Sequence, residues 1–330
     1  MTTARGPAVV LPGEDGSRPG MVDPWLADPV AAATVREVDT VVGRDVAAWW
    51  RDPATAPDPV ATHLEVVVTG VAGTRSLRAA GLEPVAVAGH GVGEFAALAA
   101  AGALPLDQVV ELVHWRAELL SLAPRPSCAG LAAVLGHDAA AVAREAIAVA
   151  RGDGPLCLAA LDAPGRAVLA GGRAELAEAG EVVRAAGLEM VRLPGRAPCG
   201  GRLVQSVAAH LSTALADLDW SVPEVPVVPN ADAEPTRDPD RLAAALRHHL
   251  TAPVLWEATT RALLALGATA VVEVGATPVL GPYARQVSPT LPVRLATGPG
   301  DAGPVLPPGL PPDATRSDAP GPALAGSAST

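Results

Sequence analysis

The most constraining feature of this chain is a short apolar run followed directly by a glycine-rich turn and an alanine-rich segment. Residues 85–88 predict a buried strand, 89–93 contain three glycines, and 94–101 open a helix. A tight turn of this kind lies at the carboxyl end of a strand, where α/β proteins bind their ligands. The sequence therefore predicts an α/β fold with a candidate site at this turn.

The same pattern recurs along the chain and divides it. A first strand is predicted at residues 8–11, and a helix over 253–266 precedes a strand at 270–274. Between these lie predicted strands at 131–135, 156–161, 167–170 and 189–193, with helices at 138–150 and 174–186. This βαββαβ order predicts a ferredoxin-like unit inserted into a hydrolase-like parallel-sheet unit.

Three parts follow from this division. We expect a large α/β subdomain over residues 1–129 plus 195–297 and a ferredoxin-like small subdomain over 130–194. A cleft between two such units is a common place for a ligand. Residues 298–330 are rich in Pro, Gly, Ala and Ser, which predicts a disordered tail.

Composition excludes several classes of function. The formal net charge is -11, with 24 basic and 35 acidic residues and no lysine, which argues against binding nucleic acid. No apolar stretch is long enough to span a bilayer. Cys128, Cys157 and Cys199 lack metal-ligand spacing, so we expect free thiols, no metal and no cofactor. The expected location is the cytoplasm.

The turn has the setting of a nucleophile elbow, G-x-S-x-G, whose serine is exposed beside the first amides of a helix. Here the third position is Gly91, which has no side chain to attack an acyl thioester. A dinucleotide-binding loop is an alternative, but its sixth position is Glu94, whose carboxylate would repel a pyrophosphate. An ordinary strand-to-helix turn also stays open.

Wider motifs resemble one family. Residues 84–104 read PVAVAGHGVGEFAALAAAGAL, and residues 112–120 read LVHWRAELL. Residues 11–21, 163–171, 229–230, 253–256 and 273–280 add further matches in the right order. Together they resemble the acyl-CoA:acyl-carrier-protein S-acyltransferases, which include malonyl-CoA transacylases and the acyltransferase domains of polyketide synthases.

The resemblance implies a damaged active site. It assigns the nucleophile to Gly91 and the histidine base to Gly200. Where the family has glutamines, this chain has Glu14, His63 and Arg166; the first belongs to the oxyanion hole. Neither side chain of the expected serine–histidine pair is present.

Other positions match the family's substrate site. Arg116 corresponds to the arginine that pairs with the free carboxylate of malonyl-type groups, although an arginine in a helix-surface salt bridge is an equal alternative. Val92 and Asn230 complete the expected substrate-binding set with Glu14 and His63.

Three functions remain open on these grounds. The first is a pseudoenzyme of polyketide or fatty-acid biosynthesis that binds an acyl carrier protein or a synthase module, with acyl-CoA or malonyl-CoA as a ligand. Arginines at 184, 192, 196 and 202 would favour an acidic carrier. The second is an active transferase with a non-standard mechanism, for instance through Cys199. A thioesterase, which needs the same missing groups, ranks last.

Overall fold

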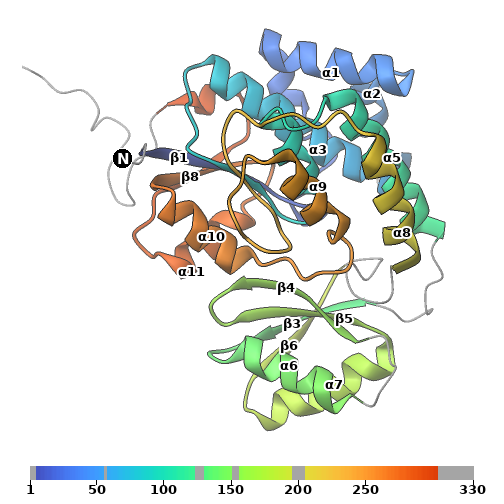
Figure 1. The fold of residues 1–330 in the computed structure, drawn as a ribbon, viewed down its shortest axis with the longest axis vertical. Helices are drawn as coiled ribbons and strands as arrows, with labels where there is room; N and C mark the ends of the chain where they lie inside the picture. The colour runs from blue at the N-terminus through green and yellow to red at the C-terminus, as the bar shows by residue number, and fades with distance from the viewer. Residues whose placement is uncertain (1–4, 56–57, 123–129, 151–155, 195–204, 304–330) are drawn as a thin grey trace, which may run out of the picture.

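The strands of the protein form two separate sheets. The structure, a computed structural model, describes residues 5–55, 58–122, 130–150, 156–194 and 205–303. One sheet has five strands and the other four. In Figure 1 the larger sheet lies within the upper body among its helices, and the smaller sheet lies below it with α6 and α7 on its outer side.

The large sheet is entirely parallel. It contains β1 (Gly6–Leu11), β2 (Val87–Gly89), β7 (Val227–Val228), β8 (Ala268–Val274) and β9 (Val293–Ala296), in the order β7-β2-β1-β8-β9. Leu11 is paired with Gly89, so β1 and β2 end side by side. The loops that start at Pro12 and His90 therefore leave the sheet at the same edge.

Alternate residues of β1 face two different cores. Val9 and Leu11 belong to a cluster on the side of α1 (Pro29–Val42), α2 (Val46–Arg51), α3 (Pro59–Ala79), α4 (Gly93–Ala100), α5 (Leu106–Leu122), α8 (Gln205–Ala214) and α9 (Pro239–Arg247). Ala8 and Val10 face α10 (Trp256–Ala265) and α11 (Leu280–Val287). Successive side chains of a strand point to opposite faces, so helices cover both sides of this sheet, as parallel sheets require.

Several helices begin where the sequence supplies a cap. At the starts of α1, α2, α3 and α9 an aspartate side chain accepts a hydrogen bond from a backbone N–H of the first turn. The caps are Asp28, Asp45, Asp58 and Asp238. In α1, α3 and α9 a proline occupies the first position of the helix, where its missing N–H costs nothing.

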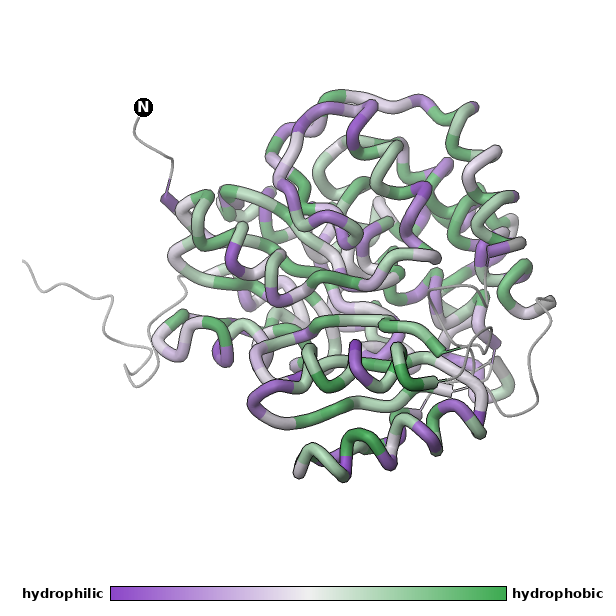
Figure 2. The backbone as a smooth tube through the Cα atoms, turned by 60° about the horizontal axis from the view of Figure 1, so that its bottom comes forward, coloured by the Kyte–Doolittle hydropathy of each residue, from purple (hydrophilic) through white to green (hydrophobic). Residues whose placement is uncertain are grey.

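The small subdomain has the predicted βαββαβ order. It consists of β3 (Gly130–Leu135), α6 (Ala139–Val149), β4 (Cys157–Ala163), β5 (Arg166–Gly171), α7 (Arg173–Ala185) and β6 (Glu189–Leu193). Its sheet is antiparallel in the order β4-β5-β3-β6, and α6 and α7 bury one face of it. Along these helices hydrophobic and hydrophilic residues alternate, as one-sided burial predicts (Figure 2). The predicted α/β class, with a parallel sheet and an inserted ferredoxin-like sheet, is confirmed.

The small sheet is joined to the large subdomain by backbone hydrogen bonds at Val254. The Leu161 N–H donates to the Val254 carbonyl at 2.8 Å, and the Val254 N–H donates to the Ala159 carbonyl at 2.9 Å. Strand β4 thus gains a short parallel partner from the large subdomain. The helix predicted at roughly 253–266 is confirmed as α10, which begins at Trp256 because Val254 makes this junction.

Residues 298–303 of the predicted tail lie within the described part of the chain. Pro299–Ala302 form a short 3-10 helix, and the Asp301 carboxylate accepts hydrogen bonds from the backbone N–H groups of Thr297 and Gly298. The segment forms this short helix despite its proline and glycines, because the Asp301 side chain binds the backbone at its start. Residues 304–330 of the predicted tail lie outside the described residues.

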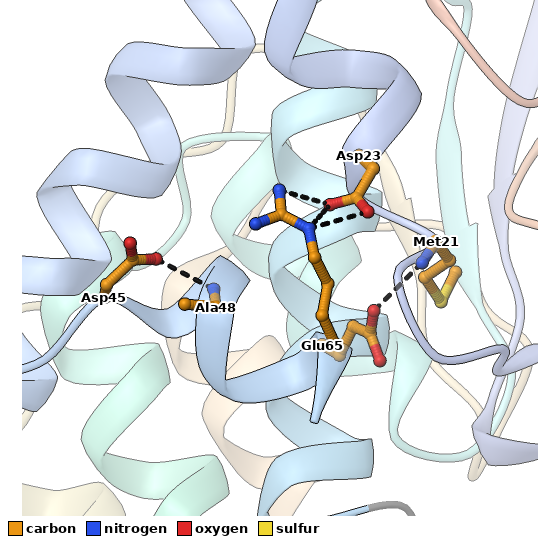
Figure 3. Close-up of polar contacts among 6 residues, drawn as sticks. Met21, Asp23, Asp45, Ala48 and Glu65 are labelled. Atoms are coloured by element: carbon orange, nitrogen blue, oxygen red, sulfur yellow. Dashed lines mark hydrogen bonds and ion pairs between the residues drawn. The ribbon is translucent and has the colours of Figure 1, made fainter. Parts of the chain in front are cut away.

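A buried carboxylate holds the loop after the first strand. Glu65 of α3 accepts a hydrogen bond from the Met21 N–H at 2.9 Å, and nearby Asp23 pairs with Arg51 (Figure 3). Glu65 is 4% exposed, and burial raises its pKa to about 7. The loop that approaches the candidate site is therefore anchored on α3.

Candidate active site

The turn between β2 and α4 has the geometry of a nucleophile elbow without the nucleophile. Gly91 has φ +54°, and among the described residues no atom lies within 4 Å of a Cβ placed on it. A Cβ on Gly89 would lie 1.9 Å from the Gly93 carbonyl oxygen, and one on Gly93 would lie 2.2 Å from the Leu11 carbonyl oxygen. Close packing thus requires glycine at 89 and 93, whereas position 91 has room for a side chain.

A second loop approaches this elbow from β1. A Cβ on Gly13 would lie 3.0 Å from the His90 carbonyl oxygen, so Gly13 and the following Glu14 sit beside the turn. The His90 N–H donates to the Leu11 carbonyl at 2.9 Å, which fixes the spacing of the two loops. Val92, predicted to contact substrate, is 4% exposed and packs in the large core, so its side chain supports the turn from below.

Glu14, His63 and Arg116 form one hydrogen-bonded chain. His63 Nε2 lies 2.6 Å from Glu14 Oε2, and Arg116 Nη1 lies 3.3 Å from His63 Nδ1. An arginine only donates, so Nδ1 must accept and Nε2 must carry the proton that is donated to Glu14. Burial lowers the pKa of His63, which fits a neutral ring, and the hydrogen bond from His63 lowers the pKa of Glu14. Three residues singled out from sequence are thus brought together.

Beneath the elbow lies a second histidine–carboxylate pair. His249 Nδ1 lies 2.6 Å from Glu94 Oε2, and the Asn230 N–H donates to Glu94 Oε1 at 3.0 Å. Glu94, Asn230 and His249 are 2%, 2% and 7% exposed, and burial lowers the pKa of His249. The side-chain amide atoms of Asn230 have no hydrogen-bond partner among the described residues.

A third cluster spans the two subdomains. His90 Nε2 lies 3.0 Å from Asp162 Oδ1, and Arg166 Nε donates to Asp162 Oδ2 at 3.0 Å. The Arg166 guanidinium lies over the ring of Tyr283 in α11, 5.3 Å from its centroid. Burial alone would lower the pKa of His90, but the hydrogen bond and charge of Asp162 outweigh it and raise that pKa. Burial would likewise raise the pKa of Asp162, yet His90 and Arg166 lower it.

Sequence reasoning missed His249, Asp162 and Tyr283. His249 and Asp162 lie 155 and 72 residues along the chain from Glu94 and His90, their respective partners. Asp162 directly precedes the motif that holds Arg166, but nothing in its local pattern indicates a partner in the other subdomain. Only the fold brings these groups together.

Part of the predicted site lies outside the described residues. This holds for Gly200, the position assigned to the base, and for Cys199, Arg196 and Arg202. Of the predicted basic stretch, Arg184 of α7 pairs with Glu181 and Arg192 of β6 is exposed. Within the described residues, no group of histidine, cysteine and acidic side chains could hold a metal ion. None of the helices in those ranges has the length and apolar character needed to cross a membrane.

The combination of a parallel sheet, an inserted ferredoxin-like sheet and an elbow at the end of β2 defines an acyl-transferase architecture. The profile of the family described as "Acyl transferase domain" matches residues 16–290, and this chain belongs to that family. The family serves fatty-acid and polyketide biosynthesis through malonyl-CoA:acyl-carrier-protein transacylases.

Particular relatives agree with this assignment. The malonyl CoA-acyl carrier protein transacylase of Escherichia coli K12 is 29% identical over 299 residues, covering 86% of this chain and 93% of the relative. An acyl carrier protein S-malonyltransferase from Vibrio cholerae has a TM-score of 0.83 at 28% identity, covering 88% of this chain and 96% of that one. The malonyl-transacylase PlMCAT, solved with the type II polyketide synthase carrier protein AntF, has a TM-score of 0.83 at 26% identity, covering 89% and 96%.

Proposed function

We propose that this chain is an acyl-transferase-fold protein without covalent turnover, which binds an acyl carrier protein or a synthase module in polyketide or fatty-acid biosynthesis. The observation that carries the proposal is Gly91. The backbone of the elbow is intact and no described atom lies within 4 Å of a Cβ placed on Gly91, but the residue carries no hydroxyl group. A covalent acyl intermediate needs a nucleophilic side chain at this place.

The base position supports the same proposal. The resemblance places the base at residue 200, which is also a glycine. The histidines around the elbow each pair with a carboxylate: His63 with Glu14, His90 with Asp162 and His249 with Glu94. Cys157 offers no replacement nucleophile, because burial raises the pKa of its thiol to about 11 and leaves it protonated at neutral pH.

An acyl carrier protein is the proposed partner. A similar protein, PlMCAT, is known in complex with its carrier. Exposed Arg192 lies on β6 of the small subdomain, and carrier proteins are typically acidic, so charge favours the encounter. We further propose that the protein works in the cytoplasm, requires no cofactor and holds an acyl thioester only as a non-covalent ligand.

Two measurements test the proposal. Intact-protein mass spectrometry after incubation with malonyl-CoA and with acetyl-CoA should show an unchanged mass. Isothermal titration with carrier proteins of the host pathway at low salt should show binding that weakens as salt is raised. Absence of carrier binding would remove the partner from the proposal.

The alternative is an active S-acyltransferase with a non-standard mechanism. It predicts a stable mass increase of the wild-type chain, or transfer of an acyl group to a carrier protein above background. A Cys199→Ser variant serves as the matched control, because it alters the remaining thiol near the base position and leaves Gly91 unchanged. Acylation that disappears in this variant would establish the alternative.

A further inference from the structure

The charged groups around the elbow are paired within the chain. Asp162 holds both His90 and Arg166, and Glu14 is linked through His63 to Arg116. The nearby carboxylate of Asp15 interacts electrostatically with Glu14, Asp162 and His90. Among the described residues, the cations near Gly91 are therefore compensated by internal carboxylates, and the carboxylate of Asp15 adds a further negative charge.

The chain from Glu14 to Arg116 runs from the surface into the interior. The Glu14 side chain is 45% exposed, that of His63 is 6% exposed, and Arg116 is 3% exposed. His63 is neutral in the tautomer that Arg116 requires. Within the hydrogen-bonded group of Glu14, His63 and Arg116, the negative charge therefore lies on Glu14, beside the elbow loop. A further buried carboxylate, Glu94, pairs with His249, whose surroundings include the positive charge of Arg116.

We propose that Glu14 sets the acyl-group selectivity of this site. Its carboxylate compensates Arg116 through His63, so a site at Gly91 favours thioesters of uncharged acyl groups and disfavours those with a free carboxylate. This inference rests on the proposed function, in that it assumes an acyl thioester as the ligand. It runs against what the position of Arg116 alone would indicate, since a buried arginine without an internal partner would attract a substrate carboxylate.

The expected size of the effect follows from the charges. A second carboxylate placed near Glu14 and Asp15 meets like charge in a partly buried setting, which corresponds to about a tenfold loss of affinity. A neutral acyl group such as acetyl avoids this repulsion. Because malonyl-CoA and acetyl-CoA share the same nucleotide portion, the ratio of their dissociation constants isolates the contribution of the acyl group.

The test is isothermal titration of the full chain with malonyl-CoA, acetyl-CoA and CoA alone. Glu14→Gln removes the charge and keeps an amide oxygen that can accept the hydrogen bond from His63. Glu37→Gln is the matched control, since Glu37 is 44% exposed and pairs with Arg75 in the helical layer. Thermal unfolding of each variant shows whether the fold is kept.

The wild type and Glu37→Gln should bind acetyl-CoA about tenfold more tightly than malonyl-CoA, and Glu14→Gln should close most of that gap. Equal or tighter binding of malonyl-CoA by the wild type would overturn the inference, as would a gap unchanged in Glu14→Gln. Failure to bind any of the three ligands would overturn it as well. If a carrier protein still bound in that last case, the proposed function would stand and only the selectivity would fall.

Discussion

The histidine–carboxylate pairs His249–Glu94 and His90–Asp162 are built from the same groups but behave differently. Burial lowers the pKa of His249, whose surroundings include the positive charge of Arg116. The pKa of His90 is raised despite burial, because Asp162 and Asp15 lie beside it. The first pair lies within the large subdomain and the second joins the two subdomains. Both rings are buried, so the difference in their neighbouring charges is what separates the directions of the two pKa shifts.

The largest expected effect comes from removing the interior carboxylate. Glu94→Ala leaves the Asn230 N–H and the His249 ring without their acceptor in a region closed to water. The free energy of unfolding should fall by about 3 to 4 kcal/mol, measured by denaturant titration. Glu257→Ala is a surface control whose loss should stay near 0.5 kcal/mol, since its pair with Arg261 is largely exposed. Equal losses in both variants would contradict the account of the interior pair.

Breaking the joint between the subdomains should have a smaller, pH-dependent effect. The contribution of Asp162 is present above its ordinary pKa of 3.8 and is lost as pH falls through its lowered folded pKa. The contribution of His90 to the free energy of unfolding is fully present below pH 6.5 and is lost as pH rises through the raised pKa of His90 in the folded state. Asp162→Asn should therefore cost about 2 kcal/mol near pH 5 and less near pH 8, measured by urea unfolding at both values. A loss of stability that does not vary with pH would contradict the assignment of this effect to the His90–Asp162 pair.

Glu65 extends the comparison to a buried carboxylate without a histidine. Its folded pKa of about 7 lies above the ordinary 4.5, so its stabilising effect is full below pH 4.5 and is lost as pH rises through 7. Glu65→Gln retains an acceptor for the Met21 N–H and removes the titration. The variant should be more stable than the wild type by about 1 to 2 kcal/mol at pH 8 and no more stable at pH 4, as shown by unfolding curves at both values.

The smallest expected effect concerns the elbow itself. Gly91→Ser forces a side chain into φ +54°, which should lower the free energy of unfolding by about 1 kcal/mol. The loss should come from backbone strain, because no described atom lies within 4 Å of the added Cβ. Gly93→Ser is the contrasting variant, since its Cβ would collide with the Leu11 carbonyl oxygen. Thermal unfolding of both variants should show that Gly93→Ser loses several times as much stability as Gly91→Ser.

The sequence was sufficient for much of the fold because its signals are local. The apolar runs and glycine turns located β1, β2 and β8, and the βαββαβ order located the small sheet. The resemblance identified Glu14, His63 and Arg116, which the structure links. It could not reveal Asp162 or His249, whose partners are distant in sequence. Nor could it show that Val254, just before α10, pairs with β4.

The central claim is that an intact elbow without a nucleophile carries out no covalent step. Intact-mass measurement decides it most directly, with the wild type and a Gly91→Ser/Gly200→His variant incubated in parallel with acetyl-CoA and malonyl-CoA. The account predicts an unchanged wild-type mass and a gain of one acyl group by the double variant. A stable acyl adduct on the wild-type chain would contradict it.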